Sequence, residues 1–124
     1  MISDRLRREL IGLLGPDGVY THPARLRAYE CDGLTGYRVT PALVVLPTTT
    51  EQVAGVVRAC ARDGVPFVAR GAGTGLSGGA LPVADGVLLV LARMRRILEI
   101  DVDNQRMVVE PGVSNLEISN GLSA

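Results

Sequence analysis

A strand–helix–strand pattern near the middle of the chain constrains the fold more than any other feature of the sequence. Residues 42–46 form a short apolar run closed by a proline, which is typical of a strand buried on both faces. Thr49 and Gln52 fit a helix-capping box, and apolar residues then recur at helical spacing, so we predict a helix over residues 50–63. Residues 65–69 open the next strand. Together these segments indicate a parallel βαβ unit.

Further elements are predicted on either side of this unit. Ser3 can cap a first amphipathic helix, whereas residues 17–41 show no sustained period and are expected to form a long connection with short turns. Residues 87–91 are typical of another buried strand, and residues 98–109 predict an antiparallel hairpin. A second capping box begins a last helix after Ser114. We therefore expect an α+β lobe with a small central parallel sheet and a hairpin alongside it.

Composition excludes several classes of function. The chain carries 13 basic and 13 acidic residues, and this balance argues against recruiting nucleic acid or an anionic membrane through bulk charge. Every basic residue is arginine, so a Walker A loop, a pyridoxal phosphate Schiff base and a lysine general base are excluded. The longest aliphatic run, residues 87–92, is far shorter than the roughly 18 residues that span a membrane. Cys31 and Cys60 lack the spacing of a metal site, and no metal is predicted.

The second predicted strand runs directly into a glycine-rich loop. Five glycines fall within the nine positions of residues 71–79. Such a loop offers backbone N–H groups with no side chains to block approach, and successive amides of this kind form a nest for phosphate oxygens. Thr74 and Ser77 add hydroxyl donors, and Arg70 adds positive charge at the edge. The segment therefore predicts a diphosphate-binding site.

Two other interpretations of this loop are weaker. Gly73, Gly75 and Gly78 formally match a dinucleotide-binding fingerprint, but that motif needs a helix to begin within it, and Gly79 and Pro82 oppose a helix. No acidic residue ends a following strand at the expected distance of about 20 residues either. A simple surface turn needs only one or two glycines. We therefore favour the phosphate nest over both.

Residues 65–82 resemble the flavin pyrophosphate loop of the vanillyl-alcohol oxidase and p-cresol methylhydroxylase type of FAD-binding domain. The likeness is carried by Val-Ala-Arg-Gly-Ala-Gly-Thr-Gly-Leu-Ser-Gly-Gly-Ala-Leu-Pro at residues 68–82. Within this superfamily the chain is similar to the FAD-binding subunits of bacterial glycolate oxidases and to the related D-lactate dehydrogenases. The similarity extends to residues 29–34, 43–47, 87–92, 109–113 and 115–116.

The resemblance implies the domain organisation, the cofactor and the residues that hold it. Residues 1–41 are expected to form an N-terminal helix and connecting segment, and residues 42–124 the first, incomplete part of the FAD-binding domain. FAD is expected to bind noncovalently, because no residue matches a covalent tether. Catalytic residues stay unassigned, His22 is interpreted as structural and Glu110 as a hairpin-edge charge. The implied cofactor-binding residues are Pro47, Arg70, Gly71, Ala72, Gly73, Thr74, Gly75, Leu76, Ser77, Gly78, Gly79, Pro111, Gly112 and Val113.

The implied function is that of the FAD-binding segment of a flavin-dependent 2-hydroxy-acid dehydrogenase that oxidises glycolate or D-lactate. The resemblance implies a 2-hydroxy acid substrate in the full-length protein, a second FAD-binding subunit and an iron–sulfur subunit as partners. It also implies a cytoplasmic location, peripheral to the inner membrane through those subunits. Family members carry further segments, so a truncated and catalytically incomplete chain is expected. The alternative is a non-catalytic remnant that binds nucleotide or serves only in subunit assembly.

Overall fold

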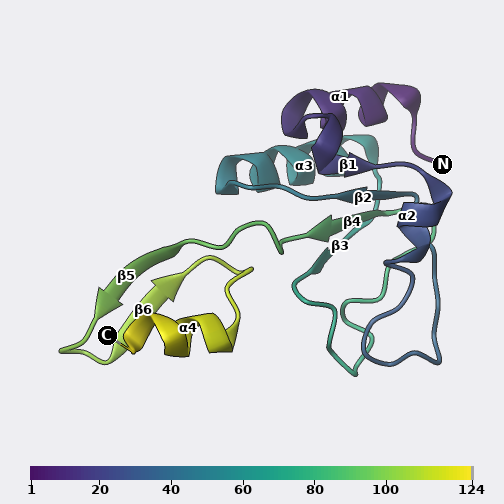
Figure 1. Ribbon diagram of the computed structural model, residues 1–124. Coiled ribbons are helices and arrows are strands. Elements are labelled where there is room, and N and C mark those ends of the chain that lie inside the picture. Colours follow the sequence, from purple (N-terminus) through teal and green to yellow (C-terminus); the bar gives the residue numbers. More distant parts are fainter. Residues whose placement is uncertain (124) are drawn as a thin grey trace.

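The computed structural model describes residues 1–123, in which two helices cover one face of a small mixed sheet and a short helix and loops lie on the other (Figure 1). The elements in chain order are α1 (Asp4–Leu14), the 3-10 helix η1 (Pro16–Gly18), β1 (Val19–Tyr20), α2 (Pro23–Arg27), β2 (Leu43–Val45), α3 (Thr50–Asp63), β3 (Phe67–Arg70), β4 (Val87–Val90), β5 (Ile97–Asp101), β6 (Arg106–Val109) and α4 (Asn115–Leu122).

The longer helices begin and end at the residues that the sequence indicates. The side-chain oxygens of Ser3 and Thr49 accept hydrogen bonds of 3.1 Å from backbone amides in the first turns of α1 and α3. Gly64 closes α3 in the left-handed conformation, with φ at 66°, where a residue with a β-carbon would be strained. Ser114 and Glu117 form a complete capping box at α4. The predicted helix over residues 50–63 is therefore confirmed.

The four-stranded sheet has the order β1-β2-β4-β3. The strands β2 and β3 both pair in parallel with β4, which lies between them, so the predicted parallel strands are confirmed. The strand β1 adds an antiparallel edge, with Val19 opposite Val45, and makes the sheet mixed. This edge and the short helix α2 lie in residues 17–41, where an irregular connection was expected. That expectation was wrong because a two-residue strand is too short to show a period.

The core lies on both faces of the sheet. The helices α1 and α3 cover one face, where Leu6, Leu10, Val56 and Cys60 are completely buried. Each such aliphatic side chain contributes roughly 1.5–3 kcal/mol on burial. A smaller cluster on the other face contains Leu26 of α2. Cys60 is thus a core residue.

A second, two-stranded sheet of β5 and β6 extends away from the first together with α4 (Figure 1). At its base, Glu110 is buried and accepts hydrogen bonds from the Arg96 backbone amide at 2.7 Å and from the Arg96 guanidinium at 2.8 and 3.0 Å. The Gly112 amide donates to the carbonyl of Met94 at 2.8 Å. These bonds fix the hairpin to the segment that leaves β4.

Candidate functional site

The glycine loop begins where β3 ends, on the face of the sheet opposite α1 and α3. The strands β2, β4 and β3 are parallel, so their carboxyl ends meet at one edge, and Arg70 lies opposite Val90 there. From this edge residues 71–82 extend below the sheet (Figure 1). They lie beside residues 28–41, which follow α2. The fold thus brings two loops that are distant in the sequence to the same side of the molecule.

The backbone amides of the glycine loop have no hydrogen-bond acceptors among the described residues. Within residues 1–123, no N–H group of residues 71–80 donates a hydrogen bond to a protein acceptor, and the next donor is Leu81, which bonds to Gly78. A β-carbon placed on Gly71, Gly75 or Gly79 would meet no atom within 4 Å, so the space beside these residues is open. Buried amides need partners, whereas exposed ones in a tight turn can bind an anion. This arrangement fits a phosphate or diphosphate group.

Arg70 lies beneath the loop rather than pointing out of it. Only 5% of the residue is exposed, and its Nε and Nη2 atoms donate to the carbonyl of Ala80 at 3.0 and 2.6 Å. Burial lowers the pKa of Arg70, and the nearby Asp32 carboxylate partly opposes that shift. Gly73 fits closely over this side chain, because a β-carbon there would lie 3.2 Å from Cδ of Arg70. Arg70 therefore joins the two ends of the loop.

The segment that follows α2 holds the middle of the loop. The amide of Gly33 donates to the carbonyl of Gly75 at 2.9 Å, and a β-carbon on Gly33 would lie only 2.5 Å from the carbonyl oxygen of Thr74. Next to it, Asp32 is 5% exposed and its Oδ1 accepts from the amide of Leu34 at 2.8 Å. Oδ2 of Asp32 is buried and has no hydrogen-bond partner among the described residues. The close approach requires glycine at position 33.

Two hollows flank the loop. The first, of about 340 Å³, lies at its start and is lined by Ala28, Tyr29, Cys31, Arg70, Gly71, Ala72, Gly73, Val90 and Ala92. The second, of about 360 Å³, is lined by Asp32, Leu34, Tyr37, Leu76, Ser77, Gly78 and Leu81. Of the predicted loop residues, 70–73 line the first hollow and 76–78 the second, whereas Thr74, Gly75 and Gly79 line neither.

The other predicted site residues lie apart from these hollows. Pro47 is fully buried at the end of β2, and Pro111 is exposed after β6. Gly112 packs so closely that a β-carbon would lie 2.6 Å from the carbonyl oxygen of Leu91, and Val113 beside it is half-buried. None of these four residues lines either hollow. Their contact with a cofactor stays a prediction.

Several residues at the site were given no role by the sequence, and four of them lie within residues 29–33. Tyr29 and Cys31 line the first hollow, while Asp32 and Gly33 lie against the loop itself. All four fall in the resembling segment of residues 29–34, which was the only signal available for them. The lone His22 caps α2, with its Nδ1 accepting from the amide of Ala24 at 3.3 Å, and lines neither hollow.

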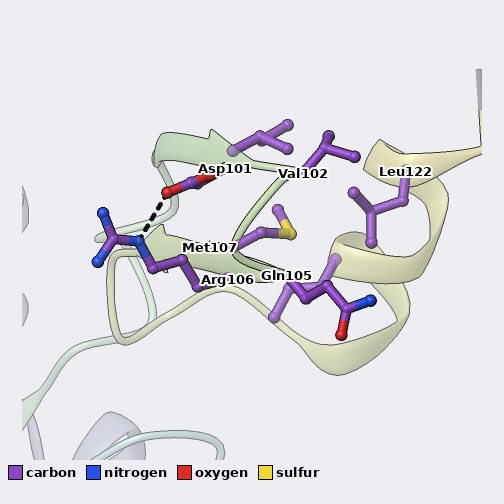
Figure 2. A pocket seen from close by; sticks show the side chains of 8 residues that line it. Asp101, Val102, Gln105, Arg106, Met107 and Leu122 are labelled. Carbon is purple, nitrogen blue, oxygen red and sulfur yellow. Dashed lines mark hydrogen bonds and ion pairs between the residues drawn. The ribbon is translucent and has the colours of Figure 1, made fainter.

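A larger hollow of about 570 Å³ lies between the hairpin and α4 (Figure 2). Its walls are mainly apolar, with Val102 and Met107 on the hairpin side and Leu122 on the helix side. The Arg106 Nε donates to Asp101 Oδ2 at 2.9 Å, so these two charges pair with each other. In the described part of the chain no group of three or more His, Cys, Asp or Glu side chains could hold a metal ion. This mainly apolar hollow, whose arginine is already paired with a carboxylate, does not fit a phosphate group.

The fold and the glycine loop together define a nucleotide-diphosphate-binding domain. Residues 41–124 match the FAD binding domain family, and the chain belongs to that family. The open amide nest fits the diphosphate of FAD, which residues 71–79 would hold. The described residues include no helix long and apolar enough to cross a membrane.

The chain is similar to several FAD-linked oxidoreductases. It is 57% identical over 95 residues to glycolate oxidase subunit GlcD of Escherichia coli (strain K12), an alignment that covers 77% of the chain and 19% of that subunit. It is 38% identical over 76 residues to D-lactate dehydrogenase of Anaerostipes hadrus, covering 61% of the chain and 16% of that enzyme. The structure of p-cresol methylhydroxylase with substrate bound superimposes with a TM-score of 0.83 at 30% identity, covering 96% of the chain and 24% of that structure. The chain thus spans about a fifth of the glycolate oxidase subunit.

Proposed function

We propose that the chain is the FAD-binding segment of a flavin-dependent dehydrogenase that oxidises glycolate or D-lactate. The run of unpaired amides over residues 71–80 carries the proposal, because it supplies the donors that a diphosphate requires. The similarity to a glycolate oxidase subunit and a D-lactate dehydrogenase supports a 2-hydroxy acid as the substrate of the complete enzyme. FAD, when bound, would supply the redox chemistry for oxidation of a 2-hydroxy acid.

The chain's own contribution is to bind and orient the cofactor. We propose noncovalent binding, in which the amides of residues 71–79 hold the diphosphate and the Thr74 and Ser77 hydroxyls add donors. Arg70 and Gly33 keep the loop in the required shape through their bonds to the carbonyls of Ala80 and Gly75. The remaining proposed contacts come from Pro47 and residues 111–113. Assembly with a second FAD-binding subunit and an iron–sulfur subunit, which would hold the cytoplasmic protein at the periphery of the inner membrane, belongs to the same proposal.

FAD titration of the purified chain tests this function. Binding should quench flavin fluorescence, and the flavin should remain with the chain on gel filtration but be released by acid precipitation, as a noncovalent ligand is. Gly75→Val should abolish binding, since the added side chain fills the open space beside the amides. Gly36→Val is the matched control, because Gly36 also has no atom within 4 Å of a β-carbon but lies outside the loop.

The outcomes separate the proposal from its alternative. Binding that survives Gly75→Val would contradict the backbone nest, and a chain that does not bind FAD would contradict the function. A chain that binds a partner subunit but not FAD would favour a role in assembly alone. For the substrate, anaerobic addition of glycolate or D-lactate to the longer enzyme containing this segment should bleach its flavin absorbance.

A further inference from the structure

A cluster of two tyrosines and two arginines stands beside the glycine loop. The guanidinium carbon of Arg25, on α2, lies 4.7 Å from the centre of the Tyr20 ring. Arg93, beyond the end of β4, donates from Nη2 to the Tyr20 hydroxyl at 3.3 Å. The ring centres of Tyr20 and Tyr29 are 6.2 Å apart. We call Tyr20, Arg25, Tyr29 and Arg93 the tyrosine–arginine cluster.

This cluster borders the hollow at the start of the loop. Tyr29 lines that hollow together with Gly71 and Gly73, and so does Ala92, the residue directly before Arg93. Both Ala92 and Arg93 are exposed. The flexible side chain of Arg93 therefore starts at the rim of the hollow.

The two arginines of the cluster carry uncompensated charge. Within residues 1–123 neither Arg25 nor Arg93 has a carboxylate within 4.0 Å, whereas Arg62, Arg96 and Arg106 each form ion pairs. Tyr20 offers both of them only neutral partners, its ring face and its hydroxyl. Two cations that converge from separate elements without a counter-charge repel each other, and an anion placed nearby relieves that repulsion.

Arg70, the cation within the loop, is already engaged by the protein. Its guanidinium is buried and bonded to the carbonyl of Ala80, so turning it toward a ligand would leave that carbonyl without its donors. Arg93 is exposed, and within residues 1–123 its guanidinium donates a single hydrogen bond, to a neutral hydroxyl at 3.3 Å. A phosphate oxygen is the stronger acceptor, because it adds charge to the hydrogen bond.

We propose that Arg93, with Arg25 stacked on the same tyrosine, supplies the positive charge for the diphosphate held at the glycine loop. This inference rests on the proposed function, since it deepens the description of the same site. Arg93 exchanges its bond to Tyr20 for a phosphate oxygen when the dinucleotide binds, and Arg25 adds to the local positive potential. The ligand class is a flavin or nucleoside diphosphate, and the phosphates are the part recognised.

The test compares FAD with riboflavin, which lacks phosphates, on four variants. Arg93→Gln should weaken FAD binding about tenfold and leave riboflavin binding unchanged. Arg93→Lys should recover most of the affinity, because it keeps the charge. Tyr20→Phe should bind FAD within about twofold of the unaltered chain, because it removes only the hydroxyl that Arg93 leaves. Arg27→Gln, an exposed arginine on the same helix as Arg25, is the control and should change nothing.

Salt provides an independent readout of charge. The Debye length falls from about 10 Å at 0.1 M to about 3 Å at 1 M salt, so the difference between Arg93→Gln and the unaltered chain should shrink over that range. The inference would be overturned if Arg93→Gln bound FAD as tightly as the unaltered chain, or if it lost as much affinity for riboflavin as for FAD. It would also be overturned if Arg93→Lys failed to recover binding. Loss of FAD binding in Tyr20→Phe would also overturn the inference, because it would show that the hydrogen bond between Arg93 and the Tyr20 hydroxyl is needed for the structure of the site. If the unaltered chain bound no FAD, the proposed function itself would fail, which is a distinct result.

Discussion

Gly33→Ala is the sharpest perturbation of the site that leaves every loop residue in place. The new β-carbon would lie 2.5 Å from the carbonyl oxygen of Thr74 and 2.8 Å from that of Gly75. Both atoms belong to the backbone, so no side chain can turn away, and one of the two segments must move. The movement stretches the 2.9 Å bond between the Gly33 amide and the Gly75 carbonyl. Losing that bond costs about 1 kcal/mol, and relieving the overlap costs about 1 kcal/mol more.

This total of about 2 kcal/mol can appear in either of two measurements. If the loop stays in place, the folded chain loses stability, and a thermal melt without FAD should shift down by about 8 °C. If the loop moves away, the melt changes little, but FAD must draw the loop back and binds up to about 30-fold more weakly. Residues 71–79 are largely exposed, and none of their amides donates a hydrogen bond to another described residue, so we expect most of the effect in FAD affinity.

The matched control for this experiment is Gly36→Ala in the same connecting segment. A β-carbon on Gly36 meets no atom within 4 Å, so both the melt and the FAD affinity should stay as they are. The reasoning would be refuted if Gly33→Ala had the melting temperature and FAD affinity of Gly36→Ala, because close packing at Gly33 would then not position the loop.

Three further predictions follow from individual contacts. Thr74→Ala, which keeps the amides and removes one hydroxyl, should cost about 1 kcal/mol, or about fivefold in FAD affinity; a complete loss in the titration would contradict the backbone nest. Hydrogen bonds from the Ser114 backbone amide and then from Arg95 lower the pKa of Glu117 from 4.5 to about 2. The Glu117 carboxylate should therefore stabilise α4 above pH 4.5, and this stabilisation should be lost as the pH falls toward 2. The amide NMR signals of α4 in Glu117→Gln should differ from those of the unaltered chain near neutral pH and converge with them in acid. Burial raises the pKa of the Cys60 thiol, so iodoacetamide should alkylate the half-buried Cys31 first and saturating FAD should slow that reaction; equal labelling by peptide mass spectrometry would count against this.

The elements that the sequence predicts correctly are those whose signals are local. The helix α3 repeats its apolar residues over 14 positions. Thr49 before it is typical of a helix start, and Gly64 after it is typical of a helix end. The strand β1 has two residues and exists because β2 offers it a free edge. Nothing within Val19 and Tyr20 themselves distinguishes that pairing from a turn, so an irregular connection was the expectation there.

The same distinction applies to the candidate site. The density of glycines over residues 71–79 marks a phosphate loop in the sequence alone, because open amides depend on the absence of side chains. The contact between Gly33 and Gly75 joins residues far apart in the chain and has no periodic signal. The resemblance in residues 29–34 indicates that this segment matters, but only the structure shows that its backbone lies against the loop.

Arg70 and Arg93 show why proximity in the sequence does not assign a charge to a ligand. Arg70 directly precedes the glycines, and the sequence therefore predicts that it supplies positive charge to them. In the structure its guanidinium is buried, and the Ala80 carbonyl accepts two of its N–H groups. An exchange with a ligand would have to break both bonds and leave the carbonyl of the half-buried Ala80 without its donors, which costs about 1–3 kcal/mol. Arg93 lies 23 positions further along the chain, yet it needs to break only one exposed bond to the Tyr20 hydroxyl. The cost of releasing each guanidinium therefore favours Arg93 as the phosphate ligand and Arg70 as the residue that shapes the loop.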